Sequence, residues 1–202
     1  MVMKNWKYRK IARMVLIDRG YDVSVKPGQG HLPGSRLIAV KAGRKLAVAV
    51  KVAHERAISF ARQSEHRWRT LHAVDLVVVV VPVKTKEGGA DVIAFEKDSL
   101  TRMFDLAWST LAKAKLQIGL NLPVFIPIDD KSRKNVGHGV AGLKRLAMWS
   151  VHLAQDELTE RSERPDEDYV LEFRRRYAAE KGVDIDKVEV RILEEKRKAR
   201  RH

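Results

Sequence analysis

The sequence predicts an α/β protein in which helices flank a mixed central sheet, followed by a small C-terminal α/β appendage. Residues 33–52, PGSRLIAVKAGRKLAVAVKV, have the pattern of a hairpin, with strands at 36–41 and 46–52 and a tight turn at Ala42-Gly43-Arg44. Residues 75–83, DLVVVVVPV, are a continuous β-branched run typical of a buried central strand. Residues 98–114 carry an apolar stripe at helical spacing, with Asp98 as the cap.

The other elements are read from the same kinds of pattern. We expect a helix over 6–19 that ends at Gly20, a short strand over 21–26 and an approach loop over 27–34 that is rich in glycine and proline. After the hairpin, the spacing of Ala57, Phe60 and Ala61 predicts a helix over 54–66. Short strands over 90–95 and 122–128 complete the predicted core.

The hairpin is expected to bury one face only. Strand side chains alternate between the two faces of a sheet, so the core-facing residues would be Leu46, Val48, Val50 and Val52. The opposite face would carry Ala47, Ala49 and Lys51.

The chain is long enough for one sizeable core with an appendage. We predict a core over 1–128, then a segment over 129–165 that comprises a glycine-rich connector, a helix at 143–157 and a charged linker. The last part, 166–202, reads as a helix over 167–181, a strand over 184–193 and a basic tail. This unit is too small to stand alone and would pack on the core or mediate a homodimer.

Charge is the strongest feature of the composition, with 40 Lys and Arg against 26 Asp and Glu and a net charge of +14. The excess lies in residues 1–70, which hold 16 basic and four acidic residues, a net charge of +12. A basic half of this kind is expected of a protein with a polyanionic partner, most often nucleic acid. A basic surface without such a partner is the plainer alternative.

Several classes of protein are excluded or disfavoured. No apolar run is long enough to span a bilayer, and no signal peptide is visible. The chain has no cysteine, which rules out disulfides and thiolate metal sites and favours a cytoplasmic location. Histidine spacings typical of metal sites, a nucleophile elbow and a phosphate-binding P-loop are all missing, so we expect neither a metal nor a cofactor.

An arginine run near the end of the basic half allows two interpretations. Arg56, Arg62, Arg67 and Arg69 lie along the helix predicted over 54–66 or just beyond it, with Trp68 between the last two. The run could contact a nucleic-acid backbone, with the indole as a stacking platform. Alternatively, the tryptophan belongs to the core and the arginines form a solvated rim.

The order helix, strand, hairpin, helix, buried strand, with Gly20-Tyr21 after the first helix and Pro33-Gly34 before the second strand, resembles the PD-(D/E)XK nuclease superfamily. The similarity covers roughly residues 5–128 and is nearest to Holliday-junction-resolvase-like and restriction-endonuclease-like members. It implies a restriction-endonuclease-like core.

The resemblance also implies where metal ligands would lie. The family's Asp corresponds to Arg36, the Glu of its Glu-x-Lys motif to Ala49, and the additional Glu of many members to Arg9. Only the lysine is kept, as Lys51. Mg²⁺ needs carboxylate oxygens, whereas arginine favours a phosphate, so this pattern predicts a protein that binds nucleic acid without cutting it.

The leading hypothesis is therefore a DNA-binding pseudoenzyme, with RNA left open as the ligand. Two alternatives remain: an active metal-dependent nuclease whose acids have moved to Glu55 and Asp75, and an assembly protein with no nucleic-acid role. The residues expected to contact nucleic acid are Arg9, Arg36, Lys41, Arg44, Lys45, Lys51, Arg56 and Arg62.

Overall fold

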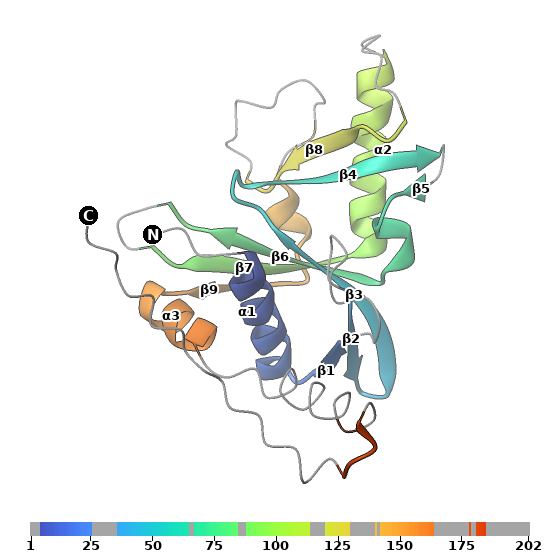
Figure 1. Ribbon diagram of the computed structural model, residues 1–202. Helices are drawn as coiled ribbons and strands as arrows, with labels where there is room; N and C mark the ends of the chain where they lie inside the picture. Colours follow the sequence, from blue (N-terminus) through green and yellow to red (C-terminus); the bar gives the residue numbers. More distant parts are fainter. Residues whose placement is uncertain are drawn as a thin grey trace, which may run out of the picture. The chain divides into compact units, whose positions relative to one another are not determined.

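The computed structural model describes residues 5–25, 36–64, 67–84, 88–113, 120–129, 140, 142–163, 178 and 181–184. The chain forms two compact units, Met1–Glu163 and Arg164–His202, and the elements discussed below belong to the first (Figure 1). The loop predicted at 27–34 and the basic tail lie outside the described residues. So does most of the glycine-rich connector, of the helix predicted at 167–181 and of the strand predicted at 184–193. The three-part division of the chain stays a prediction.

A six-stranded sheet forms the centre of the first unit, in the order β1-β2-β3-β6-β7-β9. β3 and β6 are parallel, and every other neighbouring pair is antiparallel. The predicted α/β class with a mixed central sheet is therefore confirmed. The strands are β1 Asp22–Val25, β2 Arg36–Lys41, β3 Arg44–Val52, β6 Leu76–Pro82, β7 Ala90–Glu96 and β9 Trp149–Leu153.

Two hydrophobic cores cover the two faces of this sheet. Helices α1 (Asn5–Asp18) and α3 (Gln155–Glu163) contribute to the first core, on the face that carries Val48 and Val50. Helix α2 (Lys97–Lys113) and a second, three-stranded sheet contribute to the other core (Figure 1). The second sheet has the order β5-β4-β8, with β4 Ala57–Ser64, β5 Arg67–Trp68 and β8 Pro123–Pro127. Among the described helices, none is long and apolar enough to cross a membrane.

The β2–β3 hairpin forms where it was predicted, but β3 begins at Arg44, two residues before the predicted strand. Ala42 and Gly43 have φ of 49° and 75°, the left-handed values that a two-residue hairpin turn requires. The expectation that the hairpin buries one face only is wrong, because both faces of β3 are buried in its second half. Val48 and Ala49 are each 0% exposed and belong to different cores. The small side chain of Ala49 lets the second core pack directly against the strand.

The helix predicted over 54–66 is wrong, since this segment is strand β4. Burial alternates along it, with Ile58, Phe60 and Arg62 inward, which is the period of a strand. Pairing with β8, from Ala57↔Pro127 to Ala61↔Pro123, fixes this conformation. The crossover between the parallel strands β3 and β6 therefore contains strands and the 3₁₀ turn η1 (Leu71–Ala73) where a helix was expected.

The helix predicted over 143–157 is also wrong. A 3₁₀ turn, η3 (Leu143–Leu146), is followed by strand β9, which pairs with β7. The more buried Trp149, Val151 and Leu153 alternate in β9 with exposed residues. Helix α3 begins only at Gln155, with two carboxylates in its first turn where the helix dipole favours them. It continues into the segment that was expected to be a charged linker.

Candidate nucleic-acid interface

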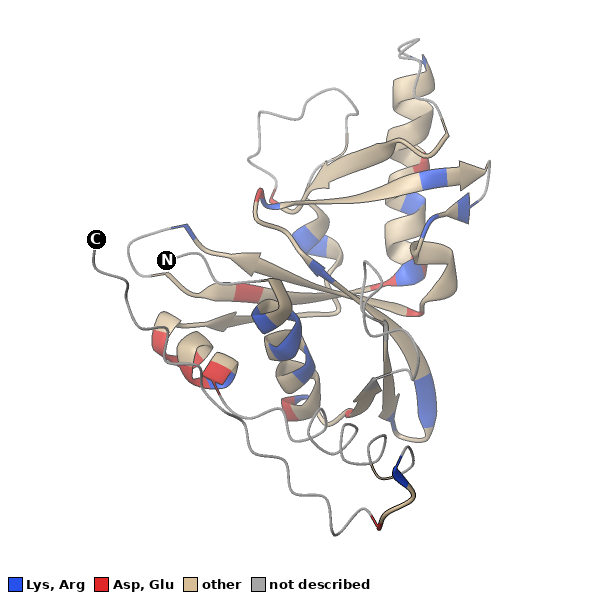
Figure 2. Cartoon of the chain, viewed as in Figure 1, with Lys and Arg blue, Asp and Glu red and all other residues tan. Residues whose placement is uncertain are grey.

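The eight cationic residues singled out by the sequence do not form one cluster. Arg44 begins β3, and Lys51 follows seven positions later on the same strand. A strand rises about 3.3 Å per residue, so the two Cα atoms are roughly 23 Å apart. Lys41, Arg44 and Lys45, here called the hairpin tip, lie at one end of β3, whereas Lys51 and Arg56 lie at or beyond the other. Figure 2 shows these basic segments apart from one another, with further basic residues along α1.

The positions that correspond to metal ligands in the nuclease family are neighbours across the hairpin. In the β2–β3 register, Arg36 lies opposite Ala49, and Lys51 follows two residues later on β3. The backbone therefore brings together the positions that the resemblance pairs, but neither Arg36 nor Ala49 offers a carboxylate. The side chain of Arg36 lies outside the described part of the structure.

Lys51 occupies a partly buried position between β3 and β4. Its Nζ donates a hydrogen bond of 2.7 Å to the carbonyl oxygen of Ser59 and lies 4.2 Å from the ring centroid of Phe60. Burial lowers the pKa of Lys51 below its usual value of 10.5. A lysine in these surroundings keeps its charge at a cost to folding stability.

This lowered pKa predicts a pH dependence of stability that Lys51→Met should remove. The unfolded chain holds the Lys51 proton more tightly than the folded one, so burial of the charge costs stability at neutral pH. This cost disappears as the pH rises towards the usual lysine value of 10.5, with a slope of at most about 1.4 kcal/mol per pH unit. Chemical denaturation of both proteins between pH 7 and 10 measures the difference. Lys45→Met, at an exposed position on the same strand, is the control. Equal pH profiles of stability for Lys51→Met and wild type would refute the lowered pKa of Lys51.

Arg9 does not share a pocket with Lys51. It lies on α1, which packs against the face of the sheet that carries Val48 and Val50, while Lys51 contacts the other core. The Nε atom of Arg9 is buried and has no hydrogen-bond partner among the described residues. The sheet thus separates two positions that the resemblance implies should lie together.

Among the predicted residues whose side chains are described, those of the hairpin tip are the most exposed. Pairing of β3 with β6 begins only at Val48↔Leu76, so the start of β3 extends beyond β6. Strand alternation puts Arg44 and Lys45 on opposite faces of the ribbon, and both side chains are exposed. Lys41 lies opposite Arg44, and its Nζ donates a 2.7 Å hydrogen bond to the carbonyl oxygen of Arg19. The tip therefore presents positive charge on both faces.

Arg56 is held by two carboxylates. Its Nε and Nη2 atoms donate to both carboxylate oxygens of Asp129, and Nη2 also lies 3.4 Å from Oδ2 of Asp91. The hydrogen bond from Arg56 lowers the pKa of Asp129, and the same bond raises the pKa of Arg56. Because the folded-state pKa of Asp129 is lowered, this pair stabilises the fold at neutral pH and loses that contribution as the pH falls into the acidic range.

Arg62 is buried, contrary to the expectation of a free phosphate contact. It is 8% exposed, and its guanidinium carbon lies 4.6 Å from the ring centroid of Trp108 and 5.5 Å from that of Trp68. Trp68 is 1% exposed, and its indole Nε1 donates a 2.9 Å hydrogen bond to Asp105. Of the two interpretations of the arginine run, the core tryptophan is correct, with Arg67 and Arg69 as its exposed neighbours.

The acids proposed for an active nuclease do not surround Lys51. Asp75 precedes β6 and accepts a 2.8 Å hydrogen bond from the backbone N–H of Ala47, near the hairpin tip. Glu55 lies beyond the other end of β3, is 84% exposed and pairs with Lys84 at 2.8 Å. Within the described ranges, no three His, Asp or Glu side chains are grouped so that they could hold a metal ion.

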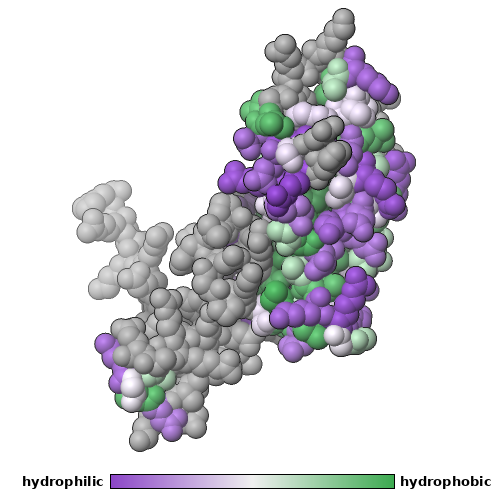
Figure 3. Space-filling view, turned by 90° about the vertical axis from the view of Figure 1, so that its right-hand side faces the viewer, coloured by the Kyte–Doolittle hydropathy of each residue, from purple (hydrophilic) through white to green (hydrophobic). Residues whose placement is uncertain are grey.

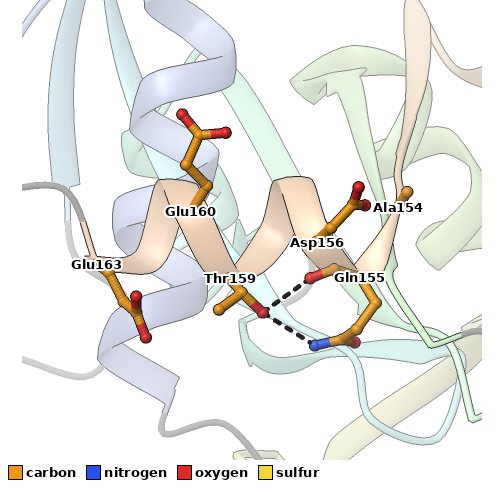
Figure 4. A pocket seen from close by; sticks show the side chains of 6 residues that line it. All are labelled: Ala154, Gln155, Asp156, Thr159, Glu160 and Glu163. Atoms are coloured by element: carbon orange, nitrogen blue, oxygen red, sulfur yellow. Dashed lines mark hydrogen bonds between the residues drawn. The ribbon is translucent and has the colours of Figure 1, made fainter.

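A depression along α3 carries acidic groups and is unsuited to a polyanion. Its lining includes the acidic residues Asp156, Glu160 and Glu163 (Figure 4). Gln155 and Thr159 in the lining hydrogen-bond to each other, and none of the described lining residues is basic. Like-charge repulsion therefore separates this surface from any nucleic-acid interface.

Sequence reasoning missed a polar cluster around Asp91 in β7. The carboxylate of Asp91 lies within ion-pair distance of His152 on β9, Lys144 on η3 and Arg56. One local signal was present, since Asp91 interrupts the apolar run 90–95, ADVIAF. Its partners are far away in the sequence, so nothing local identified them.

Comparison with known proteins gives no family. No family model matches the chain, and no curated protein matches it significantly. A solved structure that is similar is a bacterial homing endonuclease, I-Ssp6803I, at 16% identity and a TM-score of 0.35, with 70% of this chain and 88% of that chain covered. At this identity and TM-score the similarity does not establish common membership of a family.

Proposed function

We propose that this protein binds double-stranded DNA through the basic surface of its N-terminal half and does not cut it. The assignment to a degenerate PD-(D/E)XK scaffold is part of the same proposal. The observation that carries it is the register of the hairpin, in which Arg36 and Ala49 occupy the facing positions where such a nuclease keeps its acids. A divalent metal ion beside a phosphate needs those carboxylates, and an arginine there repels the ion and favours the phosphate.

The hairpin tip is the element proposed to contact DNA first. A two-stranded β-ribbon fits the major groove, whose phosphates line both sides. Lys41 and Arg44 on one face of the ribbon and Lys45 on the other would reach the two backbones. The side of the molecule on which this hairpin ends has a mostly hydrophilic described surface with small hydrophobic areas between (Figure 3). A polar surface of this kind suits an interface dominated by phosphate contacts.

The active-nuclease alternative has less support. Asp75 and Glu55 are associated with opposite ends of β3, so neither supplies the two adjacent carboxylates that a catalytic metal requires beside Lys51. The assembly-protein alternative predicts no nucleic-acid binding at all. A DNA-binding assay and a DNA-cleavage assay together separate the three hypotheses.

The function is tested by DNA-binding isotherms at two salt concentrations, together with a plasmid-nicking assay in Mg²⁺ or Mn²⁺. We expect binding that weakens steeply with salt, as the release of counterions from about 6–10 phosphates requires, and no nicking. Single-stranded, double-stranded and branched DNA and RNA in the same series identify the preferred ligand. Binding that does not respond to salt would remove the nucleic-acid function, and metal-dependent nicking would favour the nuclease.

A further inference from the structure

A group of charged side chains away from the hairpin surrounds Asp91. Asp91 is 9% exposed, and its Oδ1 lies 2.8 Å from Nδ1 of His152. Its Oδ2 lies 3.4 Å from Nη2 of Arg56 and 3.8 Å from Nζ of Lys144. Asp129, which binds Arg56 from the other side, completes the group, called the Asp91 cluster below.

The cluster lies where ligands commonly bind in sheets with parallel strands. β3 and β6 are parallel, and Arg56 follows the carboxyl end of β3 by four residues. Asp91 pairs with Val81 near the carboxyl end of β6, and His152 lies opposite Asp91 on β9. Ligands of open α/β sheets bind outside the carboxyl ends of the strands.

The three basic side chains keep donors that the cluster does not use. The side chain of His152 is 58% exposed, Asp91 binds its Nδ1 atom, and no described residue forms a hydrogen bond with Nε2. The side chain of Lys144 is 47% exposed, and its 3.8 Å separation from Asp91 is too long for a hydrogen bond. The side chain of Arg56 is 38% exposed, and no described carboxylate contacts its Nη1 atom.

We propose that Arg56, Lys144 and His152 form a second phosphate-binding site, in which the buried Asp91 carboxylate fixes the three donors in place. The ligand is a phosphate group, either of a nucleic-acid backbone or of a small molecule. The first case extends the DNA-binding function proposed above, and the second is independent of it. Lys144 and His152 are the residues that this adds to the interface.

The spacing of the donors suits a phosphate. Arg56 Nη2 and Lys144 Nζ both lie against the same oxygen, at 3.4 and 3.8 Å, so they are at most about 7 Å apart. Two oxygens of one phosphate, each accepting a hydrogen bond of about 2.8 Å, bridge nitrogens that are roughly 5–7 Å apart. A single phosphate can therefore contact two of these side chains at once.

The net charge of the cluster makes its affinity depend on His152. Arg56 and Lys144 balance Asp91 and Asp129, so the described cluster is neutral when His152 is neutral and carries +1 when the imidazole is protonated. The protonated imidazole therefore leaves the cluster with one positive charge for a phosphate.

The first test uses inorganic phosphate, with chloride exchanged for phosphate at constant ionic strength. We expect the ring signals of His152 in NMR spectra at pH 6 to shift and saturate. The signals of His72, an exposed histidine bound to the carbonyl oxygen of Trp68, should not follow. If the ring signals of His152 do not shift, or shift in parallel with those of His72, the cluster is a purely structural ion-pair network. Either result would overturn the site for free phosphate.

The second test uses a DNA duplex and variants of exposed residues that should not disturb folding. His152→Ala and Lys144→Ala should each weaken DNA binding at pH 6 by about tenfold. Arg145→Ala, which removes the same charge from the next residue of η3, should change little. Wild-type affinity in all three variants would overturn the DNA part of this proposal and leave the DNA-binding function intact. Phosphate binding at His152 in a protein that binds no DNA would support the site for free phosphate and overturn the DNA-binding function.

Discussion

Replacing Arg44 and Lys45 together with alanine should weaken DNA binding by about 10- to 100-fold at low salt. Both side chains are exposed at the hairpin tip, on opposite faces of the ribbon, and neither forms an ion pair with a described residue. Each lost phosphate contact removes about 1 kcal/mol and reduces the salt slope by about one unit, so the double variant should lower that slope by about two. Binding isotherms between 50 and 200 mM salt, a range in which such contacts weaken by orders of magnitude, measure both quantities.

The control for this pair removes the same charge elsewhere. Arg102 and Lys113 are exposed on α2, where alanine also favours the helix. If binding depended only on the net charge of +14, both double variants would weaken it equally. A larger effect at the hairpin tip locates the contact there. Equal or absent effects would mean that the hairpin does not enter the groove.

The sequence predicted those elements whose determinants are local. The hairpin follows from its Ala42-Gly43 turn and from alternation along its own strands, and β6 follows from a continuous β-branched run. Strand β4 was missed because Ala57, Phe60 and Ala61 also satisfy a helical spacing. Its conformation is decided by β8, more than 60 positions later, and no pattern within 54–66 reveals that partner.

The candidate site was predictable only in part, for the same reason. The register of the hairpin places Arg36 opposite Ala49, so two positions that the resemblance assigns to metal ligands are neighbours. The burial of Arg62 against Trp108 depends on α2, and the ion pairs of Arg56 depend on Asp129 and Asp91, which are distant in sequence. From the sequence alone, a charged residue in the basic half is therefore predicted to contact a ligand at the surface, because its partner within the fold is far away in the sequence.

Replacing Trp68 with alanine should lower the free energy of unfolding by about 3–5 kcal/mol, the cost of deleting a large buried aromatic side chain. Trp68 is 1% exposed, and its ring centroid lies 5.2 Å from that of Phe104 and 6.1 Å from that of Trp108. The change also leaves Asp105 without the indole N–H that donates to it at 2.9 Å.

Urea denaturation of four proteins, together with one DNA-binding isotherm for each, tests the role of Trp68 in full. Trp68→Phe keeps an aromatic ring but loses the hydrogen bond to Asp105, so it should cost about 1–3 kcal/mol. Trp6→Ala, at a site that is 55% exposed, should change stability by less than about 0.5 kcal/mol. Because Trp68 lies inside the core, Trp68→Phe should bind DNA like the wild type. A stable Trp68→Phe variant with impaired DNA binding would instead make this indole the stacking platform, and the core would have to open to expose it.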